Sequence, residues 1–185
     1  MKRLALLLCC LLASGCATKD SACPRLPEGG RYCLQGAALA PFSVQQQVDV
    51  TMKDRRETML VALENDQRSL RFVGLSPFGQ KLMHVECAGT QVKASVWPHS
   101  NLDPALWCAM LQLTLWPADL ARAGLRPPLR LEENGAERRV LAGTQTLIQA
   151  TRTGATPPFE RLQISMPPLD LKLDIRTVND AGAGL

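Results

Sequence analysis

The sequence is poor in aromatic and histidine side chains, and it lacks long runs of either charge. Eight of its 185 residues are Phe, Trp or Tyr, and two are His. The formal net charge is only +4 at pH 7, and no block of five or six like charges occurs. Surfaces that bind nucleic acid combine basic patches with aromatic rings on which bases stack. We therefore expect no nucleic-acid partner.

Motifs typical of metal, redox and hydrolytic sites are also absent. The sequence has no CxxC pair and no glycine-rich phosphate loop, and residues 74–79 are one residue too long for the GxSxG turn of a serine hydrolase. His84 and His99 have no Ser or Cys partner that the sequence makes evident. We therefore expect no metal ion, no cofactor and no enzymatic activity.

The longest apolar run is residues 4–12, far shorter than the roughly 20 residues that span a bilayer. The run follows a basic start at residues 1–3 and precedes the small residues 13–15, a pattern that predicts an export signal over residues 1–15. Small residues directly before Cys16 resemble the lipobox of bacterial lipoproteins, in which that cysteine receives a diacylglyceryl group and its amine an acyl chain such as palmitate. The alternative is an ordinary signal cleaved near this point, with Cys16 free.

The residue after the cysteine bears on where such a lipoprotein would reside. Lipoproteins retained at the inner membrane commonly carry an aspartate there, whereas this chain has Ala17. The resemblance therefore implies an outer-membrane protein that faces the periplasm. Two or more acyl chains anchor a protein stably, whereas a single chain does so only marginally.

The odd number of cysteines fits this interpretation. Of the seven, two lie in the export signal and Cys16 is the predicted site of lipidation. Four remain, and in an oxidising compartment they predict two disulfides with three possible connectivities. We favour the two pairs that are closest in sequence, namely Cys23–Cys33 and Cys87–Cys108.

Residues 16–41 are rich in Pro and Gly and show no sustained period, which predicts a lipidated N-terminus and tether. Apolar and polar residues then alternate, as in half-buried strands, before and after one helical segment. A tail without structure is expected over residues 179–185. The expected strands are residues 42–52, 57–63, 69–75, 80–87, 91–96, 129–133, 137–141, 144–153, 160–166 and 169–176.

The helical segment follows the fifth strand. Asp103 is a good N-cap, Pro104 suits a first turn, and the residues up to 115 are apolar on a wide face. A second short helix is expected over residues 117–123, with Gly124 as its stop. The whole pattern predicts a mainly β domain over residues 42–178: an antiparallel, strongly curved, unclosed β-barrel of about ten strands, with the helices as a lid or plug.

Three stretches resemble LolB, the outer-membrane lipoprotein that receives other lipoproteins, and the LolA/LolB fold, an unclosed barrel capped by helices. They are "LRFVGLSPFGQKLMHVECAGTQV" (70–92), "LWPADLARAG" (115–124) and "LDLKLDIRTV" (169–178). The chain also resembles LolB-like lipoproteins associated with aryl polyene lipid gene clusters. The resemblance implies an apolar cavity that binds or transfers acyl chains, lipoproteins or a hydrophobic lipid-linked product. It implies a LolA-like carrier or an envelope export complex as partner.

In LolB a leucine at the tip of one loop engages the membrane, and the matching position here is Phe78, between Pro77 and Gly79. The alternative is that Phe78 folds back into the core. The interior has two interpretations as well: an open cavity, or a packed core in a structural lipoprotein that docks an envelope export or biosynthesis complex. The candidate cavity-lining residues are Val61, Leu63, Phe72, Trp107, Met110, Leu111, Leu162, Ile164, Leu171 and Leu173.

Overall fold

The computed structural model describes residues 22–36, 39–96 and 102–180. The predicted export signal, the predicted lipidation site Cys16 and His99 lie outside the described residues. Within the described part of the chain, no helix has both the length and the apolar character needed to cross a membrane.

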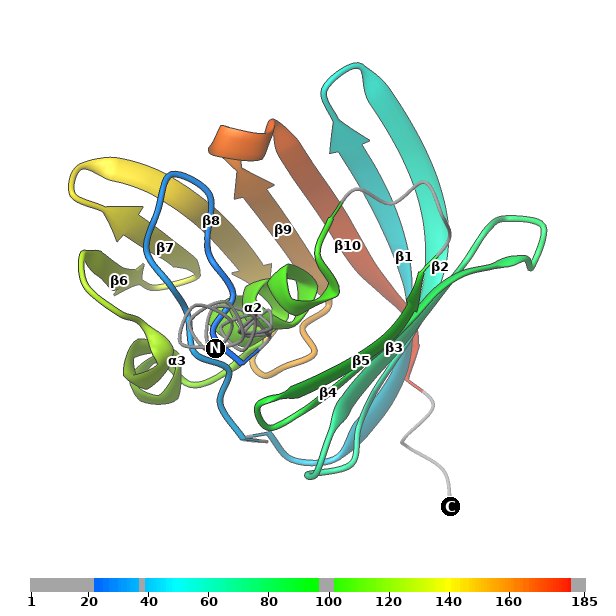
Figure 1. The fold of residues 1–185 in the computed structure, drawn as a ribbon. Helices are drawn as coiled ribbons and strands as arrows, with labels where there is room; N and C mark the ends of the chain where they lie inside the picture. Colours follow the sequence, from blue (N-terminus) through cyan, green and yellow to red (C-terminus); the bar gives the residue numbers. More distant parts are fainter. Residues whose placement is uncertain (1–21, 37–38, 97–101, 181–185) are drawn as a thin grey trace, which may run out of the picture.

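Ten strands form one antiparallel sheet (Figure 1), as the alternating pattern predicts. Its order is β5-β4-β3-β2-β1-β10-β9-β8-β7-β6, so the first and last strands of the chain pair at the centre. The strands are β1 (Phe42–Met52), β2 (Arg55–Asn65), β3 (Leu70–Leu75), β4 (Lys81–Ala88), β5 (Gln91–Val96), β6 (Leu129–Asn134), β7 (Glu137–Ala142), β8 (Gln145–Thr153), β9 (Arg161–Met166) and β10 (Leu171–Asp180). Asn179 and Asp180, predicted to begin the tail, end β10 instead.

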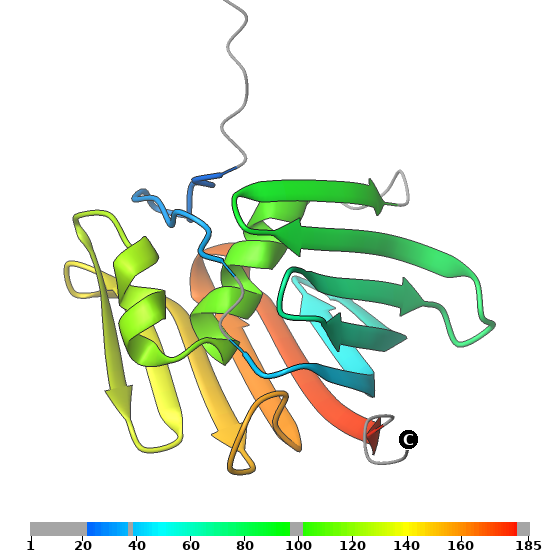
Figure 2. The ribbon, with the colours of Figure 1, turned by 90° about the horizontal axis from the view of Figure 1, so that it is seen from below.

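The prediction of an unclosed sheet with helices after the fifth strand is confirmed, but the prediction of strong curvature is wrong. The sheet is not strongly curled, and its two edges, β5 and β6, do not pair in the described chain. Helix α2 (Pro104–Leu115) lies between an arm made of β3–β5 and an arm made of β6–β8 (Figure 2). An α-helix with its side chains is roughly 10–12 Å across, so it keeps the two arms apart.

The local signals for α2 are confirmed. The Asp103 carboxylate accepts a hydrogen bond from the Ala105 backbone N–H at 3.0 Å, and Pro104 occupies the first turn. The helix ends at Leu115 with Trp116 as its C-cap, and Pro117 leads the chain into α3 (Ala118–Gly124). A separate 3₁₀ turn (Pro167–Leu169) precedes β10.

Gly124 has a different role from the predicted helix stop. It is the last residue of α3, and its φ angle does not lie in the left-handed region. A Cβ atom there would lie 2.4 Å from Cε2 of Tyr32 and 2.5 Å from the Cys33 carbonyl oxygen. Glycine is therefore required by close packing against the N-terminal segment.

That segment, residues 22–36, is part of the domain, although the sequence predicts a tether. Leu26, Tyr32 and Leu34 are buried in the same core as the sheet. The Cys33 backbone N–H donates to the Gly124 carbonyl at 2.7 Å. The segment has no period because it covers the helices as an irregular strip, so its apolar residues do not recur at regular spacing.

Both disulfides have the pairing that the sequence favours. Cys23 is bonded to Cys33, which closes the N-terminal segment on itself. Cys87 is bonded to Cys108, which joins β4 to the N-terminal half of α2.

Candidate functional site

An apolar cavity of about 40 Å³ lies between α2 and the half of the sheet formed by β1–β4 and β10. We call it the Trp107 cavity. Seven of the ten predicted lining residues meet there: Val61, Leu63, Phe72, Trp107, Met110, Leu111 and Leu173. The sequence did not single out Gln46, Val48, Val50, Met59, Met83 and Ile175, which also line it.

The remaining three predictions, Leu162, Ile164 and Leu171, are buried but do not line this cavity. β9, which carries the first two, lies on the far side of β10 from β1. Alternation identifies the buried face of a strand, but it does not show which part of that face lies opposite a helix. The missed residues Met59 and Ile175 have the same parity along their strands as residues that were named, and that parity was the available signal.

Three methionines, Met59, Met83 and Met110, form part of the cavity wall. Gly74 on β3 leaves room for one of them, because a Cβ atom at this position would lie 2.9 Å from Cγ of Met83 and 3.4 Å from Sδ of Met59. Methionine is unbranched and adapts its shape at low cost. This wall can therefore rearrange more easily than one made of β-branched side chains.

Trp107 forms another part of the wall, and its ring centroid lies 6.4 Å from that of Phe72. The indole is half-buried as a whole, yet its Nε1 atom is buried and has no hydrogen-bond partner. Buried polar groups without a partner are uncommon in folded proteins. One of the residues that line the cavity therefore carries a hydrogen-bond donor that no described group satisfies.

The C-terminal half of α2 differs, because its buried polar groups have partners. The Gln112 side-chain oxygen accepts hydrogen bonds from the Tyr32 hydroxyl at 3.2 Å and from the Gln35 backbone N–H at 2.8 Å. Its amide nitrogen donates to the Gln35 carbonyl at 2.9 Å. Burial raises the pKa of Tyr32 far above its ordinary value, so the hydroxyl stays protonated and can donate.

Arg138, which is 3% exposed, holds the end of α2 from β7. Its Nη1 donates to the carbonyl oxygens of Leu113 and Trp116 at 2.9 and 2.6 Å. Its Nε and Nη2 donate to one carboxylate oxygen of Glu133 at 2.9 and 2.7 Å, and Arg152 donates to the other oxygen at 2.6 Å. We call these three charged residues the Arg138 cluster; they border a groove of about 460 Å³ between the end of α2 and the β8–β9 loop.

Burial alone would raise the pKa of Glu133, but the hydrogen bonds and charges of Arg152 and Arg138 outweigh it. The net effect is a pKa below the ordinary value, so the carboxylate is ionised at neutral pH.

The turn between β3 and β4 presents Phe78 to solvent, with 92% of its surface exposed. The Ser76 hydroxyl oxygen accepts the backbone N–H groups of Phe78 and Gln80, at 3.3 and 3.2 Å. Gly79 has a φ of 79°, a conformation that favours glycine. The alternative in which Phe78 folds back into the core is therefore excluded, and Pro77 and Gly79 are exposed beside it.

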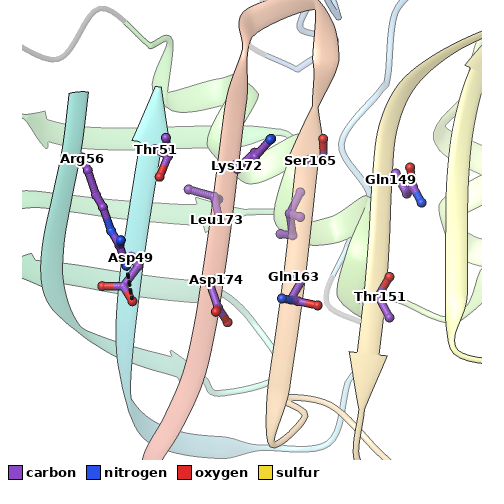
Figure 3. A pocket seen from close by; sticks show the side chains of 11 residues that line it. Asp49, Thr51, Arg56, Gln149, Thr151, Gln163, Ser165, Lys172, Leu173 and Asp174 are labelled. Atoms are coloured by element: carbon purple, nitrogen blue, oxygen red, sulfur yellow. Dashed lines mark ion pairs between the residues drawn. The ribbon is translucent and has the colours of Figure 1, made fainter. Parts of the chain in front are cut away.

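The opposite, polar face of the sheet has a hollow of about 370 Å³ over β1, β2, β8, β9 and β10 (Figure 3). Its carboxylates are paired with arginines: Asp49 lies 2.9 Å from Arg176 and 3.8 Å from Arg56, and Asp174 lies 2.6 Å from Arg161. The Thr58 hydroxyl donates to Asp49 at 2.6 Å. The two carboxylates of this face are therefore both paired, with three arginines between them.

A family model described as a protein of unknown function, DUF3261, matches residues 43–179. The chain belongs to the DUF3261 family. The DUF3261 region includes almost all of the ten-stranded sheet, both helices, the Trp107 cavity, the Arg138 cluster and the Phe78 turn. The N-terminal segment with the Cys23–Cys33 disulfide precedes it. No curated protein matches the chain.

Proposed function

We propose that this DUF3261 protein is a lipid-anchored lipoprotein of the outer membrane that binds or transfers an acylated or otherwise hydrophobic molecule. The observation that carries the proposal is the Trp107 cavity, an apolar space between a helix and one face of an open sheet. Acylated Cys16 would hold the protein at the membrane, facing the periplasm. The sequence resemblance to LolB supports the same class of cargo: acyl chains, lipoproteins or a hydrophobic lipid-linked product.

The small volume of the cavity determines what binding of such a molecule would require. About 40 Å³ is well below the roughly 300–1,000 Å³ of ordinary ligand pockets, so binding requires the lining to rearrange. α2 is attached at two places, through the Cys87–Cys108 disulfide and through the contacts with Arg138. We therefore assign the rearrangement to side chains, first of all to the three methionines, with the helix remaining in place.

The Phe78 turn would provide contact with the membrane. Turns of an antiparallel meander alternate between the two ends of the sheet, so the β1–β2 and β3–β4 turns lie at the same end. The first carries exposed Lys53, Arg55 and Arg56 with one exposed acid, Asp54, among them, and exposed Lys81 follows the second. An exposed apolar tip flanked by cations suits an interface with anionic lipid headgroups. A LolA-like carrier or an envelope export complex is the partner that the resemblance favours.

A second candidate function is that of a structural or assembly lipoprotein, whose packed domain docks an envelope export or biosynthesis complex. The observation that favours it is the same small volume, because a cavity of this size can also be a packing defect in a filled core.

Binding of an acyl probe by a soluble Cys16→Ala form distinguishes the two candidates. We expect lipid to co-purify in native mass spectrometry, and a fluorescent fatty-acyl probe to bind and be displaced by unlabelled lipid. Val61→Phe, which fills the cavity, should weaken probe binding at least fivefold. Leu60→Phe is the matched control, since the neighbouring residue points to the other face and is 47% exposed. No co-purifying lipid and no probe binding would overturn the transfer function and leave the docking function.

Vesicle flotation tests the Phe78 turn separately. Phe78→Glu should abolish association of the soluble form with anionic vesicles and leave its thermal unfolding unchanged, because the side chain makes no core contact. Gln80→Glu adds the same charge in the same turn without removing an apolar group, and it should retain most of the association. Equal flotation of wild-type protein and Phe78→Glu would remove this turn from the membrane contact.

A further inference from the structure

The unpartnered nitrogen of Trp107 is unusual even among the unpaired atoms of this protein. Within the described part of the chain, three buried side-chain atoms lack a hydrogen-bond partner: Asn65 Oδ1, Arg71 Nε and Trp107 Nε1. Asn65 and Arg71 use their other polar atoms, since the Asn65 amide nitrogen donates to two carbonyls and Arg71 Nη2 to two carboxylates. The indole of Trp107 has a single polar atom, so the whole polar capacity of this side chain is unused.

Trp107 is also the one of these three residues that lines the apolar cavity. A buried donor without an acceptor costs free energy, and a ligand that brings an acceptor recovers it on binding. A Phe at this position would avoid that cost, although it is smaller than Trp and fills less of the space. The indole N–H therefore favours ligands that bring a hydrogen-bond acceptor over ligands that bring none.

The other lining residues restrict that class. Among the described residues, no charged side chain lines the cavity, and Gln46, the other polar residue there, already donates from its amide nitrogen to the Thr177 hydroxyl at 3.3 Å. A charged group would lose its hydration without gaining a counter-charge. A buried water needs two to four polar partners, which this wall does not supply well. A neutral group that only accepts hydrogen bonds fits best. Carbonyl and ether oxygens are both of this kind, but a carbonyl oxygen projects from its chain toward a donor, whereas an ether oxygen is flanked by carbon on both sides.

The volume of the cavity agrees with a carbonyl group as its occupant. A water-sized group needs roughly 10–15 Å³ measured with a water probe, so about 40 Å³ accommodates about three such groups. A carbonyl oxygen, its carbon and the adjoining methylene are of this size. The remainder of a longer chain would enter as the methionine wall rearranges.

We propose that the Trp107 cavity selects neutral acyl esters or amides, and that their carbonyl oxygen accepts a hydrogen bond from Trp107 Nε1. This inference rests on the proposed function, and it adds a specificity: acylated molecules bind more tightly than ether-linked or purely hydrocarbon ones of equal length.

A matched pair of competitors tests the specificity: 1-monododecanoylglycerol and 1-dodecylglycerol, which differ in an ester carbonyl. Each displaces a fluorescent acyl probe from the soluble Cys16→Ala protein. We expect the ester to bind about tenfold more tightly than the ether. In Trp107→Phe the ratio should fall below twofold. Phe72→Leu is the control, because it removes apolar contact without touching the N–H and should weaken both competitors equally.

Indole ¹H–¹⁵N spectra give a second readout that does not depend on affinity. The Trp107 resonance is identified by its absence from Trp107→Phe. It should move downfield when the ester is added and stay nearly in place with the ether, because only the ester supplies the carbonyl acceptor.

The outcomes separate the two proposals. Equal binding of ester and ether by the wild-type protein, or an unchanged ratio in Trp107→Phe, would overturn the carbonyl specificity while leaving acyl binding intact. Failure of the wild-type protein to bind either competitor or the probe would overturn the proposed function itself.

Discussion

The two halves of α2 are held in the domain by different kinds of contact. At the C-terminal half, Gln112 and the Trp116 indole form hydrogen bonds with the N-terminal segment, and Arg138 of β7 donates to the last carbonyls of the helix. The N-terminal half has the Cys87–Cys108 disulfide and apolar contacts, with a cavity beside it and an indole N–H that has no partner.

This difference shows how one short helix can combine a rigid attachment with an adaptable surface. Directional hydrogen bonds to buried groups fix a single arrangement, because each misplacement leaves a polar atom unpaired. Apolar contacts with methionines tolerate several arrangements at similar free energy. A ligand that enters beside the N-terminal half therefore meets the part of the core that yields most easily.

The largest loss of stability should come from removing the Arg138 contacts at the C-terminal half of α2. Arg138→Leu removes the donors to Leu113 and Trp116 and leaves two carbonyls and Glu133 without this partner, so we expect unfolding to become easier by about 3–5 kcal/mol. Arg139→Leu, one residue along β7, removes only exposed ion pairs and should cost less than about 1 kcal/mol. Urea unfolding measures both. Similar losses would show that the Arg138 cluster does not anchor the helix.

A direct comparison within α2 should give the next largest difference. Gln112→Leu leaves the Tyr32 hydroxyl and the Gln35 backbone groups unpaired, at a cost of about 2–3 kcal/mol. Trp107→Phe removes a donor that has no acceptor, so its cost comes only from the smaller ring and should be about 1 kcal/mol. If urea unfolding gave equal losses for the two variants, the contrast between the halves would be wrong.

The packing of the N-terminal segment on α3 can be probed at two glycines. Gly124→Ala places a methyl group against the Tyr32 ring and the Cys33 carbonyl, and should cost about 1–3 kcal/mol. Gly36→Ala meets no atom within 4 Å and should be nearly neutral. Thermal unfolding of both variants measures the difference. A neutral Gly124→Ala would mean that the segment packs loosely.

Acid should weaken the contacts that hold the C-terminal half of α2 and leave those at its N-terminal half unchanged. The folded-state pKa of Glu133 is below its ordinary value of 4.5, so its stabilisation is present above that pH and is lost as pH falls through the lower folded-state value. The described residues that line the Trp107 cavity include no titratable group. Hydrogen exchange on lowering the pH should increase first near Leu113 to Trp116, and Glu133→Gln should remove this dependence. Uniform loss of protection along α2 would contradict the comparison.

Much of the fold could be predicted because its determinants are local. Leu171, Leu173 and Ile175 are buried on one face of β10 as their alternation predicts, and Asp103 caps α2 as its side chain allows. The disulfide pairing followed from short separations along the chain. For the cavity, alternation along the strands predicted Val61, Leu63, Phe72 and Leu173, and the apolar face of the helix predicted the three lining residues on α2.

Long-range features could not be predicted in the same way. Neither Arg138 nor Gln112 stands out in the sequence, since the partners of Arg138 on α2 and those of Gln112 in the N-terminal segment lie 22 to 80 residues away. The strong curvature was wrongly expected because the pattern of strands does not show how much space a helix will occupy between them.

The sequence by itself determined the strands, their alternating faces, the position of the helices and the residues able to form disulfides, because these depend on periodicity and on neighbours in the chain. Only the tertiary structure decided that the sheet is not strongly curled, that residues 22–36 join the core, and that Trp107, which lines a small apolar cavity, is left with an unpaired nitrogen. Those features arise where distant segments meet, and the fit of side chains there is a property of the assembled core.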